Sequence, residues 1–211
     1  MNKNDILNLL FQGQLVIVFD TNALFGDKRL KRLCINVNRI NRLDDKYQIK
    51  LVVPAPAHAE KLRQIRQRLK KQHKKYNHEF VLKNLKDMGI NVTSFEPWHA
   101  EKVADLFHQQ FPTQDNWNQF KLKRCLDCLG RNSLKRCLDC LKLETFEDFV
   151  ESTGQTGSAT VDWLIAGIAL AENGLLVTDD TGQEFKGIEK KTTFDELEAA
   201  VNQLLLTLTQ Q

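Results

Sequence analysis

The stretch Leu15-Val-Ile-Val-Phe-Asp20, followed directly by Thr21 and Asn22, determines how the rest of the chain is interpreted. Five consecutive apolar residues without polar alternation are typical of a parallel strand that is covered on both faces. The run ends abruptly in a carboxylate. Short buried strands that end in acids are how a parallel sheet gathers a site at its carboxyl edge. Asp20 is therefore a candidate site residue.

The same pattern recurs twice further along the chain. The run Leu51-Val-Val-Pro-Ala-Pro56 precedes Glu60, and the run Leu175-Leu-Val-Thr178 precedes Asp179 and Asp180. Each acid alone has a structural alternative, because a lone Glu on a charged helix is usually solvated and an Asp pair before a glycine can simply form a turn. Their shared position behind apolar runs favours a common site. Carboxylates are hard oxygen ligands that suit Mg²⁺ or Mn²⁺.

A further acid, Asp162, lies inside the apolar stretch Ser158-Ala-Thr-Val-Asp-Trp-Leu-Ile165. An unpaired carboxylate is costly to bury in an otherwise apolar helix. The helix dipole would stabilise an acid near the N-terminus, but Ser158 or Thr160 already offers a cap. We interpret Asp162 as functional, since buried charges cluster at functional sites.

Alternation of apolar runs and helical patterns predicts one α/β domain over residues 1–211. Its architecture is a three-layer α/β/α sandwich with a central parallel sheet, as in Rossmann-like folds, and with an irregular or helical insertion at about 112–157. Pro54 and Pro56 are expected to force an extended turn. The expected strands are 15–19, 50–53, 90–95 and 175–178, and the expected helices are 5–11, 28–43, roughly 58–85, 98–110, 159–172 and one that opens at Thr193.

Composition sets the broad class of the protein. The chain has 211 residues, of which 42% are hydrophobic and 27% charged, and these values favour a globular protein. No apolar stretch approaches the roughly 20 residues that a membrane helix needs. The start of the chain lacks the features of a signal peptide. Five cysteines, an odd number, suit a reducing compartment, so we expect a cytoplasmic protein without a membrane partner.

Residues 61–75 contain eight basic residues and no acid, although the net charge of the whole chain is only +3. A solvated helix face is the simplest interpretation. Eight like charges on one helix nevertheless cost stability unless an anion compensates them. We therefore favour a track for a phosphate backbone that leads from Glu60. The candidate nucleic-acid contacts on this track are Arg63, Arg66, Lys70 and Lys74.

An exact repeat, Leu122-Lys-Arg-Cys-Leu-Asp-Cys-Leu129 and again Leu134 to Leu141, holds four of the cysteines. A tetrathiolate zinc site is one interpretation, but the spacer between the two pairs is shorter than the usual pattern. A helical hairpin that buries the thiols as apolar groups is the interpretation we favour. The candidate zinc ligands, if the alternative holds, are Cys125, Cys128, Cys137 and Cys140.

Taken in order, the acidic motifs resemble those of PIN domains, and in particular the VapC-like ribonucleases of toxin–antitoxin pairs. The resemblance covers the chain except the cysteine segment. It rests on Phe19-Asp-Thr-Asn-Ala-Leu24, Val53-Pro-Ala-Pro-Ala-His-Ala-Glu60, Val161-Asp-Trp-Leu-Ile-Ala-Gly-Ile-Ala169 and Leu176-Val-Thr-Asp-Asp180. The chain departs from the family pattern in its greater length and in the segment at 112–157.

The resemblance implies that Asp20, Glu60, Asp162 and Asp180 form the metal and catalytic site. Thr21, Asn22 and Asp179 are then supporting residues, and Glu184 corresponds to a further outer acid. The implied function is Mg²⁺- or Mn²⁺-dependent cleavage of RNA by the toxin of a toxin–antitoxin pair. The implied partners are RNA, a cognate antitoxin protein and a second copy of the chain. The alternatives are a noncatalytic module that binds RNA or protein, and a DNA or flap nuclease of the same fold.

Overall fold

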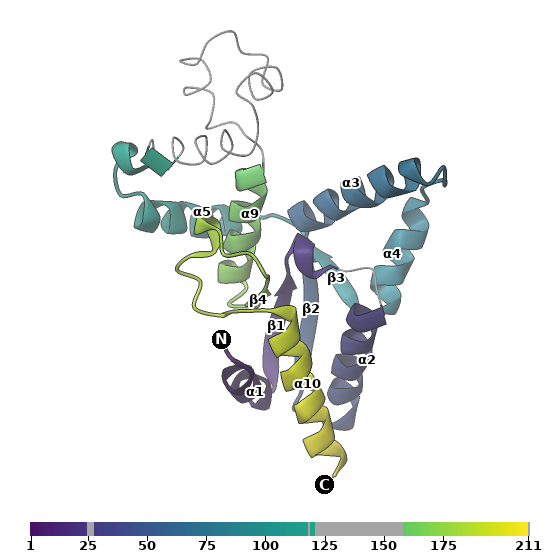
Figure 1. The fold of residues 1–211 in the computed structure, drawn as a ribbon. Coiled ribbons are helices and arrows are strands. Elements are labelled where there is room, and N and C mark those ends of the chain that lie inside the picture. Colours follow the sequence, from purple (N-terminus) through teal and green to yellow (C-terminus); the bar gives the residue numbers. More distant parts are fainter. Residues whose placement is uncertain (25–27, 118, 121–157, 211) are drawn as a thin grey trace.

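The computed structural model describes residues 1–24, 28–117, 119–120 and 158–210. A parallel sheet of five strands runs through the centre of this part, with helices on both sides (Figure 1). The strand order is β3-β2-β1-β4-β5. The strands are β1 (Gln14–Phe19), β2 (Gln48–Pro54), β3 (Ile90–Thr93), β4 (Leu175–Val177) and β5 (Lys191–Thr192). The expected three-layer α/β/α sandwich is confirmed.

Two groups of helices cover the sheet. The helices α1 (Lys3–Phe11), α2 (Lys28–Leu43) and α10 (Phe194–Thr209) pack together as one layer. The other layer consists of α3 (Ala55–Lys71), α5 (Pro97–Gln110) and α9 (Ser158–Ala171), with α5 and α9 in close contact. The helix α4 (His78–Asp87) leads into β3. No helix in the described part of the chain is long and apolar enough to cross a membrane.

The strand β1 lies at the centre because its side chains are apolar on both faces. Ile17 pairs with Leu51 of β2 on one side and with Leu175 of β4 on the other, and all three side chains are buried. The carboxyl ends of β1 and β4 therefore lie next to each other. On one side of β1 the chain adds β2 and β3, and on the other side it adds β4 and β5. Ligands of open parallel sheets bind at the carboxyl edge where the strand order reverses in this way.

The short strand β3 leaves part of β2 without a neighbour, and a side chain takes its place. The amide of Asn41 in α2 donates to the carbonyl oxygen of Ile49 at 2.8 Å and accepts from its N–H at 3.0 Å. Buried backbone groups need such partners, so one asparagine replaces a missing pair of strand hydrogen bonds. This contact also fixes α2 against the sheet.

The long helix expected over 58–85 is wrong. The structure has two helices, α3 and α4, separated by a turn at residues 72–77. Asn77 caps α4 by accepting from the N–H of Phe80 at 3.1 Å. His73 in the turn has a left-handed backbone with φ 53°. Polar capping residues compete with helix continuation, which explains the break within a run that otherwise keeps helical spacing.

The extended turn expected at Pro54 and Pro56 is also wrong. Pro54 is the last residue of β2 and the N-cap of α3, and the helix begins at Ala55. A proline in the first turn suits a helix because the missing N–H would have no helical partner there. Glu60 consequently lies in the second turn of α3, rather than at its start. The cysteine pairs and most of the expected insertion at 112–157 lie outside the described residues.

Candidate active site at the carboxyl edge of the sheet

Asp20 follows β1 directly and is only 4% exposed. Its Oδ1 accepts from the N–H of Thr21 at 2.6 Å, because Asp20 is the N-cap of the short helix η1 (Thr21–Ala23). Its Oδ2 accepts from the hydroxyl of Thr178 at 2.6 Å. Both carboxylate oxygens are thus held in place. Burial raises the pKa of Asp20 above its ordinary value, and the negative charges of Asp180 and Glu60 add to this rise against the two hydrogen bonds.

Thr178, which follows β4, is a site residue that the sequence analysis missed. Besides donating to Asp20, its hydroxyl oxygen accepts from Nδ2 of Asn22 at 3.1 Å and from the N–H of Asp180 at 3.0 Å. A hydroxyl has one proton and two lone pairs, so all three are used. Thr178 therefore joins the ends of β1 and β4. A polar residue between an apolar strand and two acids is the sequence signal for it.

Glu60 reaches the same edge from α3. Its Oε2 accepts from the hydroxyl of Thr21 at 2.8 Å, and its Oε1 lies 3.7 Å from a guanidinium nitrogen of Arg63. Lys61 is a second cation beside it. Burial, and then the charge of Arg68, lower the pKa of Lys61, while Glu60 opposes this effect. Glu60 is therefore connected both to the β1 edge and to the basic part of α3.

Asp162 projects from α9 and is half-buried. It lies beyond the first turn of the helix, so the structural explanation through the helix dipole is weak. Its pKa is raised to about 7, first by burial and then by the charges of Asp20, Glu184, Asp180 and Glu60. These four acids come from the end of β1, from α3 and from the segment that follows β4. The structure thus brings the five carboxylates within electrostatic range of one another.

Asp180 and Glu184 are brought together by a tight loop. The N–H of Gly182 donates to Oδ1 of Asp180 at 2.7 Å. A side chain at Gly182 would collide with the carboxylate of Glu184 and would lie 3.1 Å from that of Asp180. Glu184 is only 2% exposed and belongs to the short helix η3 (Gln183–Phe185). Glycine at position 182 therefore permits the two acids to approach.

The predicted supporting residues differ in what they do. Thr21 contacts Asp20 and Glu60, and Asn22 contacts Thr178 through its nitrogen. The carbonyl oxygen of the Asn22 amide accepts from the backbone N–H of Asp179 at 3.4 Å. The side chain of Asp179 is exposed. Asp179 is thus connected to the site through its backbone.

The carboxylates are chemically suited to a hard divalent cation. They are oxygen donors, two of them have raised pKa values, and repulsion between them would be relieved by a positive ion. As they lie, no three acidic, histidine or cysteine side chains in the described residues are grouped closely enough to hold a metal. Coordination would therefore require changes in the side-chain torsions of these acids.

Three of the predicted nucleic-acid contacts lie on α3, which extends away from the carboxyl edge, and Lys74 lies in the turn that follows it (Figure 1). All four side chains are exposed, namely Arg63, Arg66, Lys70 and Lys74. The structure thus makes this basic surface accessible and continuous with the helix that carries Glu60. The possible zinc ligands lie outside the described residues.

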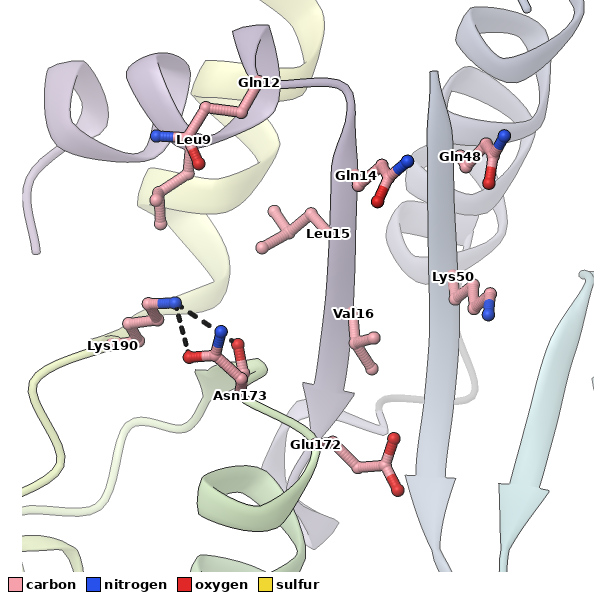
Figure 2. A pocket seen from close by; sticks show the side chains of 10 residues that line it. All are labelled: Leu9, Gln12, Gln14, Leu15, Val16, Gln48, Lys50, Glu172, Asn173 and Lys190. Carbon is pink, nitrogen blue, oxygen red and sulfur yellow. Dashed lines mark hydrogen bonds between the residues drawn. The ribbon is translucent and has the colours of Figure 1, made fainter. Parts of the chain in front are cut away.

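A second polar region lies at the amino ends of β1 and β2. It is a pocket of about 220 Å³ (Figure 2). In it, Nζ of Lys190 donates to Oδ1 of Asn173 at 2.7 Å, and Glu172 accepts from the buried ring of His99 at 3.3 Å. The lining side chains are Leu9, Gln12, Gln14, Leu15, Val16, Gln48, Lys50, Glu172, Asn173 and Lys190.

Comparison with known proteins adds no family or relative. No model of a known protein family matches the chain, and no curated protein matches its sequence.

Proposed function

We propose that this protein is a metal-dependent endoribonuclease that hydrolyses RNA phosphodiester bonds. The observation that carries the proposal is the convergence of Asp20 and Asp162, two acids with raised pKa values, from β1 and α9. Unneutralised acids at the carboxyl edge of a parallel sheet cost stability, and a functional role accounts for retaining them. The ordered motifs that resemble PIN domains support the same reaction.

Asp20, Glu60, Asp162 and Asp180 are the residues that would hold Mg²⁺ or Mn²⁺. When bound, such a cation supplies Lewis acidity toward the phosphate and lowers the pKa of water. The chain's own residues then have defined tasks. Thr178 and Thr21 hold Asp20 and Glu60 by hydrogen bonds, and the exposed cations of α3 attract the phosphate backbone toward the edge.

The resemblance also carries the biological part of the proposal. The protein acts in the cytoplasm as the toxin of a toxin–antitoxin pair, with a cognate antitoxin and a second copy of the chain as its protein partners. A gene for a small DNA-binding protein next to the gene for this chain would support that assignment. Its absence would leave the nuclease activity as a separate proposal.

The variants Asp20→Asn and Asp162→Asn test the reaction. We expect both to lose RNA cleavage in Mg²⁺ or Mn²⁺, while Asp105→Asn, at an exposed acid of α5, cleaves like the wild type. Without metal, each site variant should melt at the same temperature as the wild type or higher, since one repelling charge is gone. Added Mg²⁺ should raise the melting temperature of the wild type more than that of the variants.

Two results would contradict the proposal. One is cleavage that persists in both site variants, and the other is a wild type that neither cleaves RNA nor melts at a higher temperature in Mg²⁺ or Mn²⁺. DNA of the same sequence serves as the comparison substrate. Preferential cleavage of DNA would instead favour a DNA nuclease of this fold.

A further inference from the structure

The helices α3 and α4, with the turn between them, form an arm that extends from the acidic edge and returns to β3 (Figure 1). Little of this arm is buried. Ala57 is the one buried residue of α3, and α4 has none. An arm with so little core does not contribute much to the stability of the fold through apolar burial. Its surface is therefore available for another role.

The charged residues of α3 after Glu60, and those of the turn that follows, are all positive. From Lys61 to Lys75 the sequence has eight lysines and arginines and no acid. The helix rises about 1.5 Å per residue, so Lys70 lies roughly 15 Å along α3 from Glu60. A charged backbone that leaves the acidic edge along α3 would meet these cations in succession. Such contacts give affinity for any nucleic acid, single-stranded or double-stranded.

Aromatic rings accompany the cations at the far end of the arm. The guanidinium of Arg66 lies over the ring of Tyr76, 4.5 Å from its centroid, and the hydroxyl of Tyr76 is 3.0 Å from Nδ1 of His78. These contacts hold the tyrosine ring from two sides. Phe80, in the first turns of α4, is 62% exposed. Single exposed apolar residues are common, but this ring lies four residues after Tyr76 in the chain, at the start of the helix that follows the basic segment.

A basic track combined with exposed aromatic rings is the arrangement by which proteins hold single strands. In a double helix the faces of the bases are covered by their neighbours, so an aromatic side chain gains nothing from stacking there. In an unpaired strand the bases are free to stack on a ring. An exposed ring on the same arm as the cations of α3 would therefore favour unpaired nucleotides, whereas the cations alone would not.

We propose that the α3–α4 arm binds the single-stranded RNA that flanks the cleavage position, with its phosphates along α3 and an unpaired base stacked on Phe80. The link to cleavage rests on the proposed nuclease function, but binding to the arm does not. Tyr76, which contacts Arg66, precedes Phe80 by four residues in the chain. The arm would thus give the enzyme its preference for unpaired substrate.

Binding measured in EDTA separates the arm from the reaction, because cleavage then does not occur. The probes are a short fluorescein-labelled oligoadenylate and the duplex that it forms with its complement. We expect Phe80→Ala to weaken binding of the single strand by roughly tenfold and to leave duplex binding unchanged. Phe80→Tyr retains a ring and should bind like the wild type. Leu82→Ala removes a 41% exposed apolar side chain from the same helix and is the matched control.

The salt dependence of binding adds a second readout. Phe80→Ala should keep the slope of affinity against salt, since stacking releases no counterions. Lys70→Gln should reduce that slope by about one. Equal binding of the single strand by Phe80→Ala, Leu82→Ala and the wild type would overturn the proposal, and so would a wild type that binds the duplex at least as tightly as the single strand.

The failure of one proposal can be told from failure of the other. If the wild type binds the single strand through Phe80 but never cleaves RNA in Mg²⁺ or Mn²⁺, the arm proposal stands and the nuclease proposal falls. If cleavage depends on Asp20 and Asp162 while Phe80→Ala binds and cleaves like the wild type, the nuclease proposal stands and the arm proposal falls.

Discussion

The two ends of the central strands are both polar, but their acids have opposite surroundings. The acids at one end lie close to other acids, whereas the acid at the other end has a hydrogen-bond donor. At the carboxyl edge, the buried Asp20 and the half-buried Asp162 lie close to other acids, and both pKa values are raised. At the amino edge, the acid Glu172 accepts a hydrogen bond from the buried ring of His99. Its neighbours there are mostly amides and two lysines in a solvent-accessible pocket (Figure 2).

The difference shows where the fold tolerates unfavourable electrostatics. Acids that repel one another lower stability, whereas an acid with a hydrogen-bond donor and solvent around it does not. A polar pocket is therefore a weaker indicator of function than a cluster of like charges held in place by hydroxyl groups. On this reasoning we assign the reaction to the carboxyl edge.

The largest expected contrast between the edges is in activity. Asp180→Asn removes one acid from the carboxyl edge, and we expect RNA cleavage to fall by more than about 100-fold. Residues that only hydrogen-bond to a metal ligand typically contribute about 10- to 100-fold, and Asp180 is proposed as a ligand itself. Glu172→Gln at the amino edge keeps an oxygen that accepts from His99, and should cleave at the wild-type rate. Initial rates on one RNA substrate measure both. Comparable losses in the two variants would show that the edges are not functionally different.

The helix α9 carries Asp162 of the carboxyl edge and ends directly before Glu172 of the amino edge, so its packing should affect both edges. Gly167 lies midway along α9, and a methyl group there would collide with Cγ2 of Val103 and lie 3.0 Å from the carbonyl oxygen of His99. We expect Gly167→Ala to lower the free energy of unfolding by about 1–3 kcal/mol through overpacking. Lys102→Ala, at an exposed ion pair on α5, should change it by less than about 1 kcal/mol. Urea denaturation gives both values, and a neutral Gly167→Ala would show that α5 and α9 can move apart.

A further expected contrast is in the pH dependence of stability without metal. Asp162 has a pKa of about 7 in the folded protein against an ordinary 3.8. The folded state therefore binds more protons than the unfolded state between these values, and stability should fall as the pH rises from about 4 to 7. The slope is at most about 1.4 kcal/mol per pH unit, and partial solvent access to the side chain reduces it.

Thermal melting in EDTA across this range measures the effect. Asp162→Asn should make the melting temperature depend less on pH. The remaining decrease with rising pH comes from Asp20, whose pKa is also raised. Glu172→Gln should keep the wild-type slope. A wild type whose stability rises steadily with pH from 4 to 7 would contradict the electrostatic description of the carboxyl edge.

The parallel sheet and the elements that bear the acids could be predicted from the sequence, because buried parallel strands are continuous apolar runs. Four strands were expected close to their observed positions. The fifth, β5, was missed because its two residues are too few to show any periodicity. The break between α3 and α4 was missed because the residues on either side keep helical spacing, and no glycine or proline marks the turn.

The connections between the acids could not be predicted in the same way. The hydroxyl of Thr178 lies at the junction of β1 and β4, and its three hydrogen bonds depend on how these two strands pair. Gly182 lies between Asp180 and Glu184 in the chain, and its lack of a side chain lets their two carboxylates approach. Sequence patterns report which element a residue is on, whereas these contacts arise only from the relative placement of elements far apart in the chain.

The strand order has a consequence for when the acids of the carboxyl edge come together during synthesis. The pairing of β1 with β2 is local, but its pairing with β4 joins Ile17 to Leu175. Contacts so distant in sequence form late in folding. Asp20 and Glu60 precede β3, whereas Asp162, Thr178 and Asp180 all lie beyond residue 160. The acids of the carboxyl edge can therefore come together only after the chain has been synthesised through Asp180.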